Sequence, residues 1–319
     1  MARRVLRCDD KTLGKDLSGK VYIVTGANSG VGLETARQLV RQGGHVVMAC
    51  RRVEAGEVVA RDFTGLQGSW EVMMLDLAEL QSVRDFAEAF RRNHDRLDGL
   101  VGNAGAVFMG GEAEYTPDGF EATVAVNYLG HFLLTESLLD VLKESSPSRI
   151  ALVSSVVHAG SPKSRPKVHL DDLHYRERKY TPFGAYAEAK IAEVLYAREL
   201  AQRVKGTGVS VFSVHPGWAR SNFGRGGNLL FRSAMAIMRP FVRGFTDSNE
   251  DSAQTSLHCM ISDDAPAHSG AYFSQSSVLY RDKLCKGGGW PMESPNPNAT
   301  DMETAAELVQ VSRQLVGLD

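Results

Sequence analysis

Apolar and polar positions along the chain follow two alternating patterns. Short, continuously apolar runs rich in strand-forming residues are typical of strands, and longer segments with an apolar residue every three or four positions are typical of helices. Continuously apolar runs also indicate strands buried on both faces. The alternation therefore predicts an α/β fold, in which helices cover both faces of a doubly wound parallel sheet. Strands are expected at 20–27, 45–51, 70–78, 97–105, 148–156, 208–217 and 269–275, and helices at 32–43, 53–63, 80–94, 119–145 (one long or two paired) and 183–204.

Two segments break this alternation. Residues 218–250 are rich in glycine, arginine and apolar side chains, and residues 286–300 form a loop rich in glycine and proline. With 319 residues, 43% of them hydrophobic, the chain is large enough for one substantial core. We predict a single domain at 18–285 that carries a lid at about 218–250. An N-terminal extension (1–17) and a C-terminal loop and helix (286–319) flank it.

The charge balance and the cysteines narrow the class of protein. A formal net charge of -2 gives no basic footprint, so no nucleic-acid partner is expected. Four scattered cysteines without a CxxC pair indicate free thiols in a reducing compartment. No apolar stretch has the length of a signal-peptide core or the ~18 residues of a membrane span. We expect a soluble, cytoplasmic protein, with an organelle such as a plastid as the alternative if a targeting segment was removed.

A glycine-rich turn, TGANSGVG, joins the first strand to the first helix. Residues without a Cβ permit a tight turn and the close approach of a phosphate. The helix that follows directs its free N–H groups and positive dipole end at the turn, which favours an anion. The turn therefore predicts a site for the pyrophosphate of a dinucleotide, a purely structural turn being the alternative. Its expected contact residues are Gly26, Asn28, Ser29, Gly30, Val31 and Gly32.

The ends of the following strands predict which dinucleotide binds. Folds of this kind that take NAD place an acid after the second strand to hold the ribose hydroxyls. This chain has Arg51 and Arg52 there, and arginine pairs with a 2′-phosphate that an acid would repel. The expected cofactor is therefore NADP(H), unless the two arginines are only solvated surface charges. Further cofactor contacts are expected from Asp76, Leu77, Asn103, Ala104, Gly105, Pro216, Gly217 and Ala219.

Tyr186 and Lys190 lie one turn apart on the helix predicted at 183–204, so their side chains leave the same face. A tyrosine has a reference pKa of about 10, and a nearby ammonium lowers it by stabilising the phenolate. Such a pair can give a proton to a carbonyl oxygen, or take one from an alcohol. Ser155 ends a strand, where its hydroxyl can bind a substrate oxygen, and Asn127 is a polar residue in an apolar helix that could hold a relay water for Lys190. Packing alone is the alternative for each of them.

These motifs, in this order over about residues 18–280, resemble the short-chain dehydrogenase/reductase family and its Rossmann fold. The resemblance rests on TGxxxGxG, the NAG at 103–105, Asn127, the serine pair 154–155, YxxxK and the Pro-Gly pair. It implies four catalytic roles. They are Tyr186 as general acid/base, Lys190 as its tuner and a ribose ligand, Ser155 as substrate orienter and Asn127 as anchor of the proton relay.

Within that family the chain is similar to the retinol dehydrogenase branch, through TGANSGVGLETARQL, NYLGHFLLT, VSSVVHAG and SVHPGW. Light-dependent protochlorophyllide oxidoreductases are close relatives of that branch. Two departures separate the chain from them: a long insertion before the catalytic tyrosine is absent, and Trp218 replaces their cysteine after the Pro-Gly pair.

The predicted lid favours a lipophilic substrate, because its residues include Trp218, Phe223 and several other large apolar side chains. Packing of this stripe on the domain is the alternative. The arginines interleaved with it could contact anionic lipid heads, which would place the lid at a membrane surface, or they form the solvated face of a helix. The sequence leaves a homo-oligomer open.

The predicted function is NADP(H)-dependent hydride transfer between nicotinamide and a lipophilic carbonyl or alcohol, such as a retinoid, another isoprenoid or a steroid. Two alternatives are light-dependent reduction of protochlorophyllide or a related tetrapyrrole, and a non-catalytic NADPH-binding sensor or scaffold. No metal is expected, because His131, His158 and His215 show no ligand spacing and the chemistry needs no metal.

Overall fold

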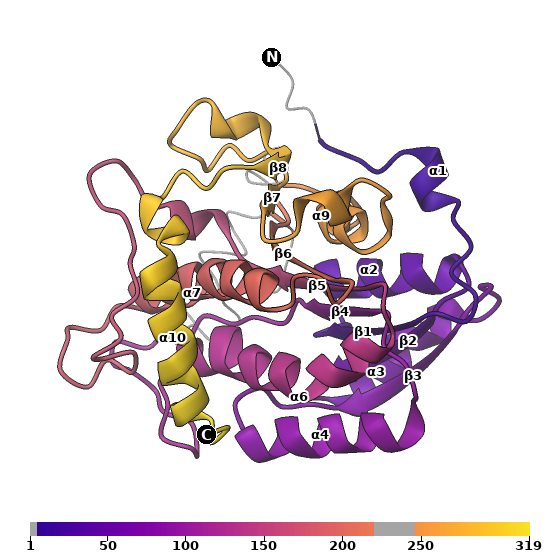
Figure 1. The fold of residues 1–319 in the computed structure, drawn as a ribbon, viewed down its shortest axis with the longest axis horizontal. Helices are drawn as coiled ribbons and strands as arrows, with labels where there is room; N and C mark the ends of the chain where they lie inside the picture. Colours follow the sequence, from indigo (N-terminus) through magenta and orange to yellow (C-terminus); the bar gives the residue numbers. More distant parts are fainter. Residues whose placement is uncertain (1–4, 220–245) are drawn as a thin grey trace.

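The computed structural model describes residues 5–219 and 246–319, and an eight-stranded sheet runs through their centre (Figure 1). The strand order is β3-β2-β1-β4-β5-β6-β7-β8. From β1 the chain adds strands on one side as far as β3, and then returns to add β4 to β8 on the other side. Strands β1 to β7 are parallel, and β8 is antiparallel to β7. The strands are β1 Val21–Thr25, β2 His45–Cys50, β3 Ser69–Met74, β4 Gly99–Gly102, β5 Ser148–Val153, β6 Val209–His215, β7 Tyr272–Ser274 and β8 Gly289–Met292.

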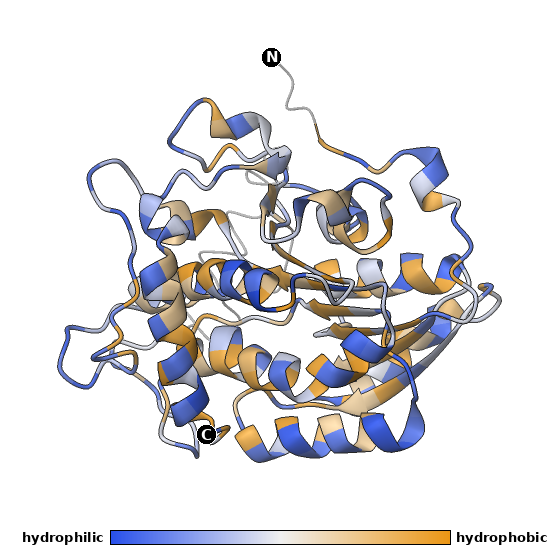
Figure 2. Ribbon diagram, viewed as in Figure 1, coloured by the Kyte–Doolittle hydropathy of each residue, from blue (hydrophilic) through white to orange (hydrophobic). Residues whose placement is uncertain are grey.

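Helices cover both faces of the sheet, as predicted (Figure 1). On one face α2 and α9 pack together over apolar side chains such as Val24 and Met48. On the other face α4, α6 and α7 cover the alternate strand positions, such as Ile23 and Val47, and α10 packs on α7. The apolar sides of these helices face inward and their hydrophilic sides outward (Figure 2). The helices are α1 Asp10–Leu13, α2 Gly30–Arg41, α3 Val53–Ala60, α4 Leu80–Asn93, α5 Ala122–Val124, α6 Gly130–Glu144, α7 Pro182–Arg203, α9 Asn249–Ile261 and α10 Met302–Leu315.

The predicted helix at 119–145 is one continuous helix with an irregular centre. A π-helical turn, Ala125–Leu129, separates α5 from α6. Such turns insert a residue into the i→i−4 pattern and are frequent at functional sites. Here the turn contains Asn127, which the sequence analysis singled out.

Three features differ from the sequence predictions. Residues 289–292 of the predicted loop pair with β7 as an antiparallel edge strand, although Gly289 and Pro291 are poor strand formers. Strand β3 is not buried on both faces, because it is the other edge of the sheet. Helix α9 was missed because it buries small polar residues, Ser252, Thr255 and Ser256, which hide its apolar periodicity.

The flanking segments share the core of the central domain. Cys8 and Leu17 belong to the apolar cluster beneath α2, and Leu308 of α10 belongs to the cluster around α7. Of the predicted lid, residues 220–245 lie outside the described residues, Phe223 among them. No helix in the two described ranges is both long enough and apolar enough to cross a bilayer.

Candidate active site

The glycine-rich turn lies at the carboxyl end of β1, beside the point where the strand order reverses. Gly26 and Gly30 have φ values of 65° and 62°, a left-handed conformation that favours glycine. The position that a Cβ of Gly30 would occupy has no atom within 4 Å, whereas a Cβ on Gly32 would overlap the Asn103 side chain and lie 2.8 Å from the Gly26 carbonyl oxygen. Gly32 therefore serves close packing of α2, while Gly30 leaves the turn open on its outer side.

The amino end of α2 faces this open side. Ser29 is the N-cap residue, but its side chain makes no capping hydrogen bond to the first turn. The first N–H groups of a helix have no partner within the helix, and with the dipole they attract an anion. The turn thus has the geometry expected of a phosphate site, and Asn28, Ser29, Gly30 and Val31 lie on it as predicted.

Arg51 and Arg52 follow β2 at the same edge of the sheet, and both are exposed. The Nε of Arg51 lies 4.0 Å from the Oδ2 of Asp76, and the Arg51 side chain is 65% exposed. Asp76 uses its other oxygen to accept a hydrogen bond from the Ala78 N–H at 3.0 Å. The Asp76 carboxylate therefore lies beside Arg51 and also shapes the loop after β3, while Leu77 is buried under Gly130.

The ends of β1 and β4 are fastened together by Thr25. Its Oγ1 accepts hydrogen bonds at 2.9 Å from the N–H groups of Asn103 and Ala104, and the Asn103 side chain donates to the Thr25 carbonyl oxygen at 2.9 Å. The Nε2 of His131 lies 2.9 Å from the same Thr25 hydroxyl. The Thr25 hydroxyl also lies 3.4 Å from the Val101 carbonyl oxygen, to which it can donate its own proton. The sequence analysis did not single out Thr25.

Asn127 ties the π-helical turn to the chain after β4. Its Nδ2 donates to the carbonyl oxygens of Ala106 and Thr123, each at 2.7 Å, and its Oδ1 accepts from the Ala106 N–H at 3.2 Å. A Cβ on Gly105 would lie 2.7 Å from that Oδ1 and 3.7 Å from the Nζ of Lys190. Gly105, Asn127 and Lys190 therefore converge at one point. The amide of Asn127 is engaged by backbone groups, so it positions this loop, and the relay water stays a prediction.

Tyr186, Lys190 and Ser155 come together at the carboxyl end of β5. Helix α7 starts with a Thr181 cap that accepts a hydrogen bond from the Gly184 N–H at 3.1 Å. Tyr186 is buried, its ring centroid is 5.6 Å from the Lys190 Nζ, and its phenol and the Ser155 hydroxyl share a hydrogen bond. Tyr186 is therefore close to both Ser155 and Lys190, and the catalytic roles of the three residues stay predictions.

The pKa of Tyr186 differs from the expectation. Burial raises it above its ordinary value, the Ser155 hydrogen bond lowers it, and the charge of Glu193 raises it further. Lys190 was expected to lower it. Instead, the Nζ of Lys190 donates to the Val153 carbonyl oxygen at 2.7 Å and to the Glu193 carboxylate at 2.9 Å. The Lys190 ammonium therefore donates hydrogen bonds to Val153 and Glu193, which reduces its electrostatic effect on the Tyr186 phenol.

Glu193 is the residue of this site that the sequence analysis missed. It is 1% exposed, and its Oε1 has no hydrogen-bond partner and lies 3.9 Å from the Nδ1 of His131. Burial raises the pKa of Glu193 to about 8 despite the opposing charge of Lys190. Burial, followed by the Lys190 charge, lowers the pKa of His131 to about 3, so that imidazole is neutral near neutral pH. The signal in the sequence was an acid three positions after Lys190 on an apolar helix face.

The Pro-Gly pair leads into a fixed turn. Gly217 has a φ of 90°, and a Cβ there would overlap the Asp247 carboxylate. That carboxylate accepts a hydrogen bond from the Trp218 N–H at 2.9 Å, and the Asp247 N–H donates to the Trp218 carbonyl oxygen at 2.9 Å. Ala219 forms a parallel bridge with Asp247. The two ends of the predicted lid are therefore side by side, with Trp218 half-buried at the junction.

The three histidines considered for a metal have other partners. His131 contacts the Thr25 hydroxyl, as described above. The Nδ1 of His215 accepts a hydrogen bond from the Val156 N–H at 3.2 Å. His158 contacts the Ser155 carbonyl oxygen at 2.5 Å and the Ser294 hydroxyl at 2.9 Å. Burial lowers the pKa of His158 to about 4. These histidines support the backbone around the site, and the absence of a metal there stays a prediction.

Comparisons with known proteins place the chain in a family. The sequence profile of the short chain dehydrogenase family matches residues 20–164. Human retinol dehydrogenase 13 is 38% identical over 95% of this chain and 86% of its own length. Bovine retinol dehydrogenase 12 is 40% identical over 95% of this chain and 88% of its own.

Solved structures agree with the observed fold. An uncharacterized protein from Mycobacterium paratuberculosis superposes with a TM-score of 0.72, at 31% identity and 95% coverage of both chains. A protein described as an NAD(P) dependent gluconate 5-dehydrogenase from Beutenbergia cavernae, with bound NADP, has a TM-score of 0.63 at 25% identity over 81% of this chain and 96% of its own. The chain therefore belongs to the short-chain dehydrogenase/reductase family, among its retinol dehydrogenase-like members, and is an oxidoreductase that acts on alcohol or carbonyl groups.

Proposed function

We propose that this oxidoreductase uses NADP(H) and interconverts a lipophilic carbonyl compound and its alcohol, with a retinoid-like substrate. The observation that carries the proposal is the contact of Ser155, Tyr186 and Lys190 at the carboxyl edge of the sheet, next to the glycine turn. It unites a proton donor, a hydroxyl that orients it and a cation.

The residues of the turn fit a nicotinamide dinucleotide. The open space at Gly30 and the amino end of α2 suit the pyrophosphate. Arg51 and Arg52, exposed beside the turn, suit a 2′-phosphate, because a guanidinium offers several donors in one plane. Asn103, Ala104 and Gly105 provide a surface of small side chains and backbone on which the remainder would lie, and in this proposal Pro216, Gly217 and Ala219 would contact its nicotinamide end.

The reaction follows from the positions of the Tyr186 and Ser155 hydroxyl groups. Bound NADPH supplies the hydride that reduces the carbonyl carbon. Tyr186 gives its phenolic proton to the carbonyl oxygen of the substrate. The Ser155 hydroxyl, which is hydrogen-bonded to the Tyr186 phenol, would orient the phenol oxygen and the substrate oxygen. Because burial raises the pKa of Tyr186, the phenol holds its proton at neutral pH and is in the protonated form that carbonyl reduction requires.

Lys190 is held in a fixed position for this step. Two of its three N–H donors are engaged by Val153 and Glu193, which leaves one for the ribose near Gly105. At high pH the ionised Glu193 carboxylate offsets part of the electrostatic effect of the Lys190 ammonium on Tyr186. When Glu193 is protonated, this offset is smaller. Asn127 fixes the backbone of the loop at 105–106, against which the ribose would lie.

The substrate class is inferred from the relatives and from Trp218. The matched retinol dehydrogenases are named for retinol, a lipophilic alcohol. Trp218 provides a large apolar surface directly after the Pro-Gly pair. No observation on this chain favours photoreduction of a tetrapyrrole or a non-catalytic sensor. A cytoplasmic location, a homo-oligomer and membrane contact through the lid stay predictions.

The test is NADPH oxidation measured with all-trans-retinal, a steroid ketone, a quinone and a short aliphatic aldehyde, in darkness and in light. We expect turnover in darkness, a higher kcat/KM for the lipophilic carbonyls, and tighter binding of NADPH than of NADH. Equal binding of the two cofactors would refute the NADP(H) assignment. Preference for the short aldehyde would refute the proposal of a lipophilic substrate, while the assignment as a carbonyl reductase would stand.

A further inference from the structure

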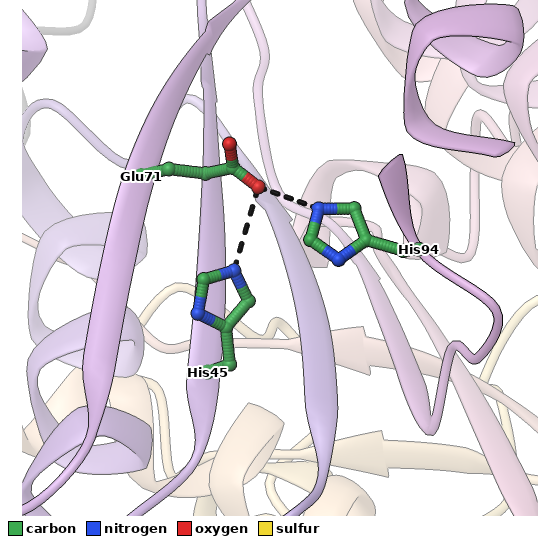
Figure 3. Close-up of side chains that lie close together, drawn as sticks. All are labelled: His45, Glu71 and His94. Carbon is green, nitrogen blue, oxygen red and sulfur yellow. Dashed lines mark hydrogen bonds and ion pairs between the residues drawn. The ribbon is translucent and has the colours of Figure 1, made fainter. Parts of the chain in front are cut away.

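Two imidazoles and a carboxylate meet at the amino edge of the sheet, away from the active site (Figure 3). The Nε2 of His94 lies 2.6 Å from the Oε1 of Glu71, and the Nε2 of His45 lies 3.4 Å from the same oxygen. All three potential ligand atoms lie within 4.8 Å of one another. In the described residues this is the one group of three or more such side chains with that spacing.

The strand register places these side chains together. His45 is the first residue of β2 and pairs with Ser69 of β3, while Val47 pairs with Glu71. Side chains two positions apart share a face, so His45 and Glu71 point to the same side of the sheet, the side that α4 covers. His94 is the C-cap residue of α4. Three elements therefore each contribute one side chain to the cluster.

The two rings are already oriented. The Nδ1 of His45 lies 2.8 Å from the Ser69 hydroxyl, which directs its Nε2 toward Glu71. A metal-bound histidine usually has such a partner on its other nitrogen, because that contact fixes the tautomer. The His94 ring stacks on Phe90 with centroids 4.7 Å apart. The side chains of His45, Glu71 and His94 are 27%, 36% and 15% exposed, so an ion can reach them from solvent.

We propose that His45, Glu71 and His94 form a binding site for a divalent transition metal ion of the zinc class. Imidazole nitrogen and carboxylate oxygen are ligands that Zn²⁺ takes in a tetrahedral site, with water as the fourth ligand. At the usual zinc distances two tetrahedral ligand atoms are about 3.3 Å apart. The observed 2.6 and 3.4 Å to the Glu71 oxygen lie near that spacing, and the two imidazole nitrogens, which lie within 4.8 Å of each other, complete it by side-chain movement.

The ion would join the exposed edge strand β3 to β2 and to the end of α4. The cluster lies at the amino ends of β2 and β3, whereas Tyr186 lies near the carboxyl ends of the parallel strands, at the opposite end of the sheet. The site is therefore separate from the active site, and turnover is not expected to depend on it. An ion that binds only the folded chain stabilises it by mass action. At about one hundred times the dissociation constant, the folding equilibrium shifts roughly 100-fold, which raises Tm by about 4 °C for a chain of this size.

The experiment uses the full chain after treatment with a chelator. Zn²⁺ is titrated by calorimetry, Co²⁺ by its visible absorption, and Tm is measured with and without each ion. We expect one ion per chain, a rise in Tm, and a loss of at least tenfold in affinity for His94→Gln and for His45→Gln. The exposed His268→Gln is the matched control and should bind as the unmodified chain does.

Tm without metal shows whether each variant is folded. If Zn²⁺ gives no binding signal and no change in Tm, the cluster is an ordinary hydrogen-bonded group and the proposal is wrong. The same holds if the ion binds but neither His45→Gln nor His94→Gln weakens it. Turnover of the folded variants on the substrate found above should remain within about twofold of the unmodified protein.

Discussion

Replacing the buried carboxyl of Glu193 with the amide in Glu193→Gln should change how the stability of the protein depends on pH. Burial raises the pKa of Glu193 from 4.5 to about 8, so the carboxyl holds its proton more tightly in the folded chain. Its protonated form therefore stabilises the fold fully below about 4.5, and that contribution is lost as the pH rises through about 8. Integrated from about pH 5 to about pH 8, this amounts to roughly 3 kcal/mol of unfolding free energy.

The assay is equilibrium urea unfolding of both proteins at several pH values in that window. Glutamine cannot ionise, so Glu193→Gln should gain on the unmodified protein steadily as the pH rises. The groups near this carboxyl include Lys190 on the same helix and His131 on α6. Burial lowers the pKa of His131 to about 3, so the folded protein does not protonate this imidazole within the window.

Glu136 supplies the control, because it is a buried carboxyl with the opposite shift. Burial raises its pKa, but hydrogen bonds from Arg203 and Tyr196 outweigh burial and leave it below the ordinary value. Its contribution is present above its unfolded pKa and is lost only as the pH falls. The difference between Glu136→Gln and the unmodified protein should thus stay constant from about pH 5 to about pH 8. A Glu193→Gln difference that is equally constant would refute the raised pKa, and would mean that Glu193 is ionised beside Lys190 throughout this pH range.

Three further predictions concern the reaction. Tyr186→Phe keeps the ring but removes the proton, so steady-state kcat should fall by about 10² to 10⁴ while NADPH binding, measured by fluorescence, changes little; near-normal turnover would mean that the proton comes from another group. Arg51→Ala should weaken NADPH by about tenfold and NADH by less than twofold in the same titration, and an equal loss for both would remove its role at the 2′-phosphate. Trp218→Ala should raise KM for retinal severalfold without affecting NADPH affinity, whereas unchanged kinetics would place the substrate elsewhere.

The sheet was predictable because its buried strands are continuously apolar and the helices between them have a clear apolar period. The glycine turn and the Tyr186–Lys190 pair were predictable for another reason: tight turns and one-turn helix spacings are local in sequence. Strand β8 was not, since an edge strand needs only a neighbour with free backbone groups and tolerates Gly289 and Pro291.

The missed parts of the site are contacts over long distances in sequence. Thr25 meets His131 across 106 positions, and neither residue is unusual in its local context. Glu193 was close enough to Lys190 to be noticed, but an acid on a helix is usually solvated, and only the packing of α6 and the π-helical turn shows that it is buried. The direction of the Tyr186 pKa was wrong for the same reason, because burial and pairing of charges cannot be read from spacing.

The bridge between Ala219 and Asp247 has a consequence for the evolution of this chain. Since these two residues meet there, any segment inserted between them is closed at its base, and for a flexible insert the entropic cost of closure grows only by about 0.6 kcal/mol for each doubling of its length. Segments of other lengths and compositions could therefore be grafted onto the same two anchor residues with little effect on the sheet or on Tyr186. A chimaera that carries the corresponding segment of another dehydrogenase would inherit new selectivity while keeping its catalytic apparatus, which makes this junction a natural place to redesign the enzyme.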